Sequence, residues 1–224
     1  MENGMRHELK YLISASAAEL LRRRLPCIMQ RDPHAGPTGQ YTIRSLYFDD
    51  FNGGAYYEKI DGVCDRLKYR IRLYNYNTSF MKLECKEKHG SLTRKRAKTV
   101  SAEQVAALRE NTPIAGAEGL VLELQQKLRW EGLRPKVLVD YDRTPFVSVY
   151  GNTRITLDEN VRTRPYIAHL FASPRAMIPV MDPDQVILEV KFDDFLPGHL
   201  VAALADIPKV NMAISKFALC MSYI

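Results

Sequence analysis

One short segment constrains the fold of this chain more than any other. Between residues 64 and 75, cationic and apolar side chains alternate, and the cations are Arg66, Lys68, Arg70 and Arg72. Because successive side chains of a β-strand point to opposite faces, this pattern predicts a strand with one cationic face and one apolar face. The next two segments repeat it, with charged sets at Lys82, Glu84, Lys86 and Lys88 and at Arg94, Arg96 and Lys98.

Like charges on one face of three successive strands need an explanation. A solvated outer face would account for a single such strand, but like charges directly opposite each other destabilise a sheet. A bound polyanion would remove this repulsion, so we interpret the cationic faces as the lining of a concave anion-binding surface. Arg66 and Lys68 are expected at its rim, where they would steer anions rather than bind them.

Eight antiparallel strands can tilt and close into a barrel that provides such a surface. We expect strands at residues 5–13, 40–48, 64–75, 79–89, 92–100, 136–149, 153–158 and 185–192. Helices are expected at 16–25, 101–110, 120–130 and from about residue 211, and the proline-rich segment 166–183 is expected to be irregular. Ser16 with Glu19, and Ser101 with Gln104, have the spacing of capping boxes.

The predicted fold class is therefore α+β and mainly antiparallel. It is an eight-stranded closed β-barrel, or tunnel, with a cationic interior and helices packed outside, and it forms a single domain over residues 1–224. The 224 residues include 32 Lys+Arg and 26 Asp+Glu, a formal net charge of +6 that this interior would account for.

The composition and the missing motifs exclude several functional classes. No apolar run is long enough to span a membrane, the first residues lack the apolar region of a signal peptide, and the 4 cysteines are scattered, so we expect a reduced, cytoplasmic protein. The chain has no P-loop, Rossmann or zincin motif. Aromatic residues are not interleaved with the basic strand faces, which argues against nucleic acid as a partner.

Carboxylates among the predicted inner cations suggest a metal ion. In a phosphate site a carboxylate usually holds a divalent cation that bridges to the phosphate, rather than contacting the phosphate itself. Glu189 is the first candidate, and Glu8 and Glu84 follow. A salt bridge to a neighbouring cation is the alternative for each of them.

Several motifs in order along the chain resemble the VTC domain family, the polyphosphate polymerase domain within the triphosphate tunnel metalloenzymes. They are Arg6–Tyr11, Ile43–Asp50, Tyr69–Tyr74, Leu83–Lys86, Asp142–Phe146, Arg154–Asp158, Leu188–Phe192 and Ser215–Phe217. Each is weak alone, but their order and spacing span almost the whole chain.

The resemblance implies a tunnel that binds the triphosphate of ATP with Mn²⁺ or Mg²⁺ and moves the terminal phosphoryl group onto a growing polyphosphate chain. It implies these phosphate-binding residues: Lys10, Arg44, Arg70, Arg72, Lys86, Arg94, Arg96, Arg143, Arg154, Lys191 and Lys216. The residues expected to act in catalysis are Arg70, Arg72, Lys86, Lys191 and Glu189, with Glu189 on the metal. ATP and pyrophosphate or polyphosphate are the expected partners, and a membrane-protein partner is suggested by analogy alone.

The sequence departs from the family pattern in two places. The hydrolytic branch has Glu-x-Glu-x-Lys in its first strand, whereas Arg6 stands at the first Glu position here, which favours the polymerase over the hydrolase. Ala213 replaces a lysine often found near the C-terminus. The assignment around Arg94-Lys95-Arg96 is ambiguous by one residue, and strand parity favours Arg94 and Arg96 over Lys95. A tunnel triphosphatase and a non-catalytic polyanion-binding module remain alternatives.

Overall fold

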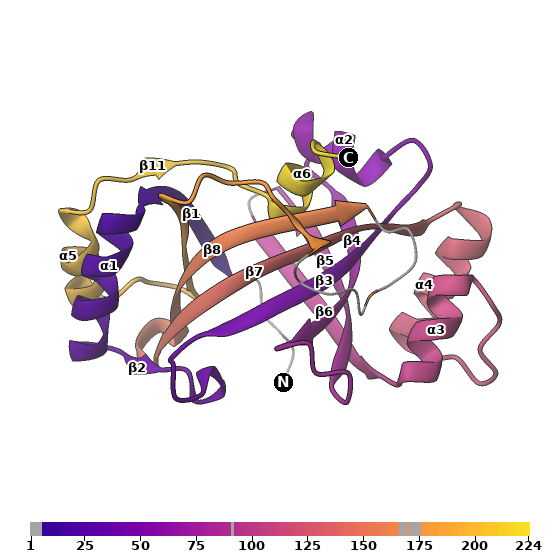
Figure 1. Ribbon diagram of the computed structural model, residues 1–224, viewed down its shortest axis with the longest axis horizontal. Helices are drawn as coiled ribbons and strands as arrows, with labels where there is room; N and C mark the ends of the chain where they lie inside the picture. Colours follow the sequence, from indigo (N-terminus) through magenta and orange to yellow (C-terminus); the bar gives the residue numbers. More distant parts are fainter. Residues whose placement is uncertain (1–5, 91, 166–169, 171–175) are drawn as a thin grey trace.

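The computed structural model describes residues 6–90, 92–165, 170 and 176–224, and its strands form one antiparallel sheet (Figure 1). In this part of the chain the sheet is 11-stranded with the order β11-β1-β10-β8-β7-β3-β4-β5-β6, while β2 pairs with β7 and β9 with β8. The strands are β1 (His7–Ser14), β2 (Gln30–Arg31), β3 (Tyr41–Asp49), β4 (Arg66–Tyr74), β5 (Met81–His89), β6 (Leu92–Val100), β7 (Arg134–Ser148), β8 (Thr153–Pro165), β9 (Ile178–Pro179), β10 (Gln185–Phe192) and β11 (Val210–Asn211). The longer strands coincide with the predicted segments, so the mainly antiparallel fold is confirmed.

The predicted closed barrel is not formed by hydrogen bonds in the described residues. The sheet order ends at β11 and β6, and a single isolated bridge between Arg6 and Thr93 connects the β1 side to β6. The reason is that β11 pairs with β1 at Tyr11 and Leu12 and occupies that part of its free edge. Only the N-terminal end of β1 therefore comes close to β6, and the sheet curls without a closing ladder.

Four of the six helices in the described chain cover the apolar face of the sheet. Two of them lie near its β6 edge and two near its β1 edge. The helices are α1 (Ala15–Arg24), α2 (Gly54–Ile60), α3 (Ala102–Glu110), α4 (Gly119–Trp130), α5 (Gly198–Ala205) and α6 (Lys216–Met221). Helices α3 and α4 pack on β4–β6, while α1 and α5 pack beside β1, β8 and β10 (Figure 1). Ile71 and Leu83 alternate with the charged residues of β4 and β5, and both are fully inaccessible to solvent in the core that these strands form with α4. Burial of these apolar side chains holds the apolar face of the sheet against the helix.

Local signals explain most of the helix starts. Ser101 and Gln104 form the predicted capping box of α3. The predicted start of α1 is wrong by two residues, because the N-cap is Ser14, whose Oγ accepts a hydrogen bond from the Ala17 N–H at 3.2 Å. The last helix begins at Lys216 rather than near residue 211, where the chain first adds strand β11 to the sheet.

Helix α6 corrects the expectation that helices lie only outside. Its residues Phe217 and Cys220 pack with Tyr47, Tyr141 and Ile187, which lie on the sheet face opposite to that covered by α4. Helix α2 lies beside α6 and the C-terminus, at the upper side of the view in Figure 1. None of the helices in the described ranges has the length and apolar character needed to cross a membrane. The predicted irregular segment 166–183 lies partly outside the described residues.

Candidate phosphate-binding site

The charged strand faces converge on one side of the curled sheet, which we call the inner face. On β4 and β5 it carries Arg70 opposite Glu84 and Lys68 opposite Lys86, as the two-residue alternation requires. On β1 and β10 it carries Lys10 opposite Glu189. The ion pair between Lys86 Nζ and Glu8 Oε2, 2.7 Å apart, joins the β5 side to the β1 side across the inner space.

Arg70 and Arg72 form the centre of the β4 side. Arg70 donates to Glu84 Oε2 from Nε at 2.7 Å and to the Tyr47 hydroxyl from Nη1 at 2.8 Å. Arg72 donates to Ser45 Oγ and to the Tyr141 hydroxyl, each at 3.3 Å. Its guanidinium is 3.7 Å from the same Glu84 carboxylate.

The carboxylate of Glu84 is thus the shared ion-pair partner of Arg70, Arg72 and Lys95. Burial opposes ionisation of Glu84, but Arg70, Arg72 and Lys95 outweigh it and hold its pKa far below the usual range. Glu84 is 1% exposed and remains ionised at any physiological pH. The surrounding cations outnumber it, so this centre keeps a net positive charge available to an anion.

Two carboxylates face each other on the β1–β10 side. Glu8 and Glu189 are within hydrogen-bond reach, and both lie among lysines: Lys10 Nζ is 3.0 Å from Glu8 Oε1, and Lys191 Nζ is 2.9 Å from Glu189 Oε1. Burial and mutual repulsion raise the pKa of Glu8, but Lys10 and Lys191 reverse this and leave the pKa lowered. The pKa of Glu189 lies well below its usual value because Lys191, Lys10 and Arg143 overcome its burial.

The floor of the inner face is a buried network around Asp158. Arg143 makes a bidentate pair with Asp158, at 2.6 and 2.7 Å, and also donates to Glu189 Oε2 at 3.1 Å. Lys216, at the start of α6, reaches Asp158 Oδ2 at 2.5 Å. Arg143 and Lys216 both lie over the ring of Tyr141, and the cations around that ring lower its pKa although the residue is buried.

Comparison with protein-family models matches residues 5–224 to the VTC domain. The chain belongs to the VTC domain family. The VTC domain is part of the triphosphate tunnel fold superfamily. No curated protein matches the chain.

Solved structures show the same fold for this VTC domain. A Bacillus halodurans protein described as a candidate adenylate cyclase is 15% identical, with 92% of this chain and 89% of that chain covered and a TM-score of 0.53. A Hippeastrum protein, described as a candidate adenylyl cyclase with a dominant triphosphatase activity, is 17% identical, with 98% and 96% covered and a TM-score of 0.53. At these identities the likeness concerns the fold alone.

The structure does not bring all predicted phosphate-binding residues of the VTC domain together. Arg44 points to the outer face, where it makes a bidentate pair with Asp140 at 2.8 and 2.7 Å and is 1% exposed. Arg154 lies on the inner face opposite Lys191, but its guanidinium is turned to Asp32 and the Tyr41 hydroxyl, both 2.7 Å away. The remaining inner members are Lys10, Arg70, Arg72, Lys86, Arg143, Lys191 and Lys216.

The choice of Arg94 and Arg96 over Lys95 was wrong. Lys95 pairs in register with Lys86 and its Nζ lies 3.2 Å from Glu84 Oε1, so Lys95 is on the inner face. Arg96 instead lies under α4, where it donates to Glu123 Oε1 at 2.9 Å. The sequence contained the information needed to place Lys95. With His89 paired to Leu92, the register of the hairpin sets Lys95 opposite Lys86 and therefore on the same face as Lys86.

The carboxylates fit a divalent metal ion at Glu8 and Glu189 but not at Glu84. The described residues contain no group of three or more His, Cys, Asp or Glu side chains that could hold a metal alone. Thr156, in register with Glu189, has a buried hydroxyl with no hydrogen-bond partner among the described residues. Two carboxylates and a hydroxyl are the oxygen donors that Mg²⁺ or Mn²⁺ prefers, and phosphate oxygens commonly complete such a site. Glu84 has Arg70 and Ala97 as its register partners, so no second carboxylate or hydroxyl lies directly opposite it.

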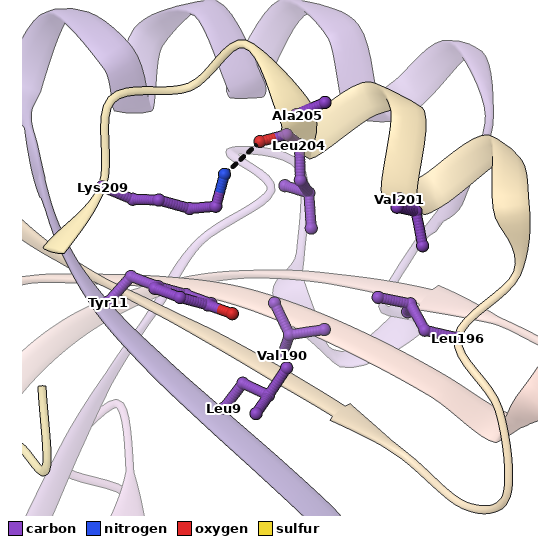
Figure 2. Close-up of a pocket in the computed structure, with 8 residues that line it drawn as sticks. All are labelled: Leu9, Tyr11, Val190, Leu196, Val201, Leu204, Ala205 and Lys209. Carbon is purple, nitrogen blue, oxygen red and sulfur yellow. Dashed lines mark hydrogen bonds between the residues drawn. The ribbon is translucent and has the colours of Figure 1, made fainter. Parts of the chain in front are cut away.

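The cavity shown in Figure 2 is not part of this site. It has a volume of about 160 Å³, lies between β1, β10 and α5, and is lined by apolar side chains such as Leu9 and Val190. Those residues alternate with Glu8 and Glu189, so the cavity is on the opposite face of the sheet. Its one charged lining residue, Lys209, donates to the Leu204 carbonyl at 2.6 Å.

Proposed function

We propose that this VTC domain is a polyphosphate polymerase, which transfers the terminal phosphoryl group of ATP to the end of a polyphosphate chain. The observation that carries the proposal is the convergence of Arg70, Arg72, Lys86 and Lys10 on a partly buried inner face where carboxylates are too few to neutralise them. A phosphate chain supplies the missing negative charge, and membership of the VTC family points to the same substrate class.

The reaction needs no nucleophilic side chain. A terminal oxygen of the acceptor phosphate bonds to the γ-phosphorus of ATP, the bond from that phosphorus to the β–γ bridging oxygen breaks, and ADP leaves with the bonding electrons. Arg70 and Arg72 would bind the oxygens of the transferred group, since both guanidinium groups lie on the inner face within reach of one carboxylate. Lys10, Lys86 and Lys191 would stabilise charge on the neighbouring phosphates.

Glu189 and Glu8 would hold Mn²⁺ or Mg²⁺, with the Thr156 hydroxyl beside them. When bound, the metal neutralises phosphate charge and aligns the phosphate oxygens. Arg143 holds Glu189 in place through its contact at 3.1 Å, and Asp158 fixes Arg143 from behind. Glu189, Arg143 and Asp158 are nearly fully buried, which would limit the access of water on this side of the site and favour transfer to phosphate over hydrolysis.

A tunnel triphosphatase is the second candidate, because the Hippeastrum protein of similar fold is described as having a dominant triphosphatase activity. The first strand argues for transfer instead. Arg6 stands where a second carboxylate would be needed, and its Nε pairs with Asp193 at 2.7 Å at the edge of the sheet. Glu8 is the one carboxylate that β1 contributes to the inner face.

The test is to incubate the purified protein with ATP, Mn²⁺ and a pyrophosphate primer and to resolve the products on a gel. We expect long-chain polyphosphate together with ADP. Orthophosphate without polymer would indicate the triphosphatase, and tight, salt-sensitive polyphosphate binding without turnover would indicate a binding module. The matched control is Arg94→Gln, which removes an exposed arginine from the outer side of β6 and should leave the rate unchanged.

A further inference from the structure

The apolar face of β1 and β10 carries the cavity of Figure 2, which the proposed reaction does not use. The cavity has a volume of about 160 Å³, is partly open to solvent and lies between the two strands and α5. A dry apolar cavity of about 150 Å³ is large enough to bind benzene, so this one has room for an apolar group of about six carbon atoms. Its apolar lining residues are Leu9, Val190, Leu196, Val201, Leu204 and Ala205.

Two polar groups border this apolar space, the Lys209 ammonium and the Tyr11 hydroxyl. Figure 2 shows the Tyr11 ring beneath Lys209, whose Nζ lies 5.9 Å from the ring centre. Lys209 Nζ donates to the carbonyls of Leu204 and Ile207, at 2.6 and 3.4 Å. An ammonium group has three N–H donors, so one remains for a ligand. The Tyr11 hydroxyl has no hydrogen-bond partner among the described residues.

Lys209 also lacks a charged partner within the fold. In the part of the chain that the structure describes, no carboxylate lies within ion-pair distance of its Nζ. Asp206, three residues earlier, is held by Arg24 through two hydrogen bonds at 2.6 and 2.9 Å. The sequence of α5 contains no Asp or Glu, and the carbonyls that Lys209 contacts carry no net charge. A cation beside an apolar cavity therefore matches a ligand with an anionic head and an apolar body.

We propose that this cavity binds a small apolar carboxylate. Its carboxylate group contacts Lys209 and Tyr11, and an apolar body of about six carbon atoms lies between α5 and the two strands. Water is a poor occupant, because a buried water needs two to four polar partners and the lining offers two polar groups at one side. The site is separate from the inner face, since Leu9 and Val190 alternate with Glu8 and Glu189 along the strands.

The test is an NMR titration of the methyl-labelled protein with hexanoate, followed at the Leu and Val methyl groups that line the cavity. Acetate provides the carboxylate without the apolar body, and 1-hexanol provides the body without the charge. Lys209→Met removes the ammonium group. Val201→Phe introduces a larger side chain into the cavity from a position that is 50% exposed, so it should leave the fold intact.

Lys136→Met is the matched control for Lys209→Met. Lys136 Nζ also donates to two backbone carbonyls, those of Asp50 and Phe51, at 3.5 and 3.3 Å. It also lies 5.9 Å from the centre of an aromatic ring, that of Phe51, but it does not line the cavity. The two substitutions thus remove the same kind of local contact and differ in the cavity.

We expect hexanoate to shift the methyl signals of Val190, Leu196 and Leu204 and to bind about 10-fold more tightly than either acetate or 1-hexanol. Lys209→Met should weaken hexanoate binding by about 10-fold and 1-hexanol binding by less than about 3-fold. Val201→Phe should weaken the binding of both ligands by about 10-fold, and Lys136→Met should change neither by more than about 3-fold.

Four results would overturn the proposal. They are unshifted cavity methyl signals, equal affinities for hexanoate and 1-hexanol, unchanged hexanoate binding in Lys209→Met or Val201→Phe, and a loss in Lys136→Met equal to that in Lys209→Met. Equal losses of hexanoate and 1-hexanol in Lys209→Met would show that Lys209 only shapes the cavity, and the carboxylate assignment would fail. The titrations contain no ATP and no metal, so their outcome is independent of the polymerase test.

Discussion

Arginines lie on both faces of this sheet, and their surroundings differ. On the outer face Arg44 has its own carboxylate, Asp140, and Arg96 lies between Glu87 and Glu123. On the inner face Arg70 and Arg72 share Glu84, which also serves Lys95. One carboxylate or more per cation completes an ion pair within the fold, whereas an excess of cations leaves charge for a ligand. On the account proposed here, the ratio of cations to carboxylates, and not burial alone, distinguishes arginines that bind the ligand from arginines that form ion pairs within the fold.

The largest expected effect is a loss of folding stability when the ion pair between Arg44 and Asp140 on the outer face is broken. Arg44→Met leaves the buried Asp140 carboxylate without its bidentate partner and should lower the free energy of unfolding by about 3–5 kcal/mol. This corresponds to a fall in melting temperature of roughly 6–20 °C. The double variant Arg44→Met/Asp140→Leu should recover most of it. An unchanged melting temperature with lost phosphate binding would instead assign Arg44 to the ligand.

The inner arginines should behave in the opposite way. Arg70→Ala removes the guanidinium that we propose binds the transferred group, and it should slow polyphosphate formation by about 10²–10³-fold. The folded state should lose little stability, because Glu84 keeps Arg72 and Lys95 as partners. Rates and thermal unfolding measured on the same preparation check both expectations. Loss of the fold with loss of activity would show that Arg70 is a structural ion pair like Arg44.

The acidic residues also differ between the two faces: we expect substitution of Glu189 on the inner face to affect the reaction rate, and substitution of Glu87 on the outer face to leave it unchanged. Glu189→Gln should reduce the metal-dependent rate by about 10²-fold while leaving tripolyphosphate binding without metal intact, because the lysines around it remain. Glu87→Gln, on the outer side of β5 beside Arg96, should leave the rate unchanged. Equal Mn²⁺-dependent rates in wild type and Glu189→Gln would refute the metal assignment.

The smallest effect concerns Lys68, whose Nζ lies over the Phe217 ring and has no carboxylate partner among the contacts of the described residues. The pKa of Lys68 is about 7 in the folded chain against 10.5 for an ordinary lysine. The unfolded chain therefore holds more protons at this residue between these values, and the protein gains stability as the pH rises through that window. The charges that face Lys68 are Arg66 on β4, Lys86 on β5, Lys59 on α2 and Lys10 on β1.

Lys68→Met should therefore stabilise the protein at pH 6–7 by about 1 kcal/mol, since partial solvent exposure screens the repulsion. The melting temperature should rise by roughly 2–4 °C there, and the gain should shrink toward pH 10. Thermal unfolding across this pH range measures it. A gain independent of pH would show that the added apolar surface, and not the removed charge, is responsible.

Strand alternation was enough to place much of the inner face. On β4 every second residue is charged, and on β5 and β10 most of the charged residues fall on one side of the strand, so Arg70, Lys86 and Glu189 could be assigned to one side from the sequence. Where both sides of a strand are buried the signal disappears. Strand β3 is buried at nearly every position, so alternation gave no reason to remove Arg44 from the phosphate-binding residues that the family resemblance implied.

Other features depend on contacts that no local pattern records. The position of Lys95 depends on the hairpin turn, and a shift of one residue exchanges the two faces. The meeting of β1 and β6 at one bridge, and the insertion of Phe217 on the inner side, both bring together segments that are far apart in the sequence. Periodicity within a segment does not show which other segment will cover it.

A crystal structure with a non-hydrolysable ATP analogue and Mn²⁺ tests the central claim most directly. We expect the phosphates of the analogue to lie on the inner face in contact with the Arg70 and Arg72 guanidinium groups, with the anomalous peak of manganese beside Glu189. Phosphates bound on the outer face near Arg94 and Arg96, or a manganese peak away from Glu189 and Glu8, would contradict the account.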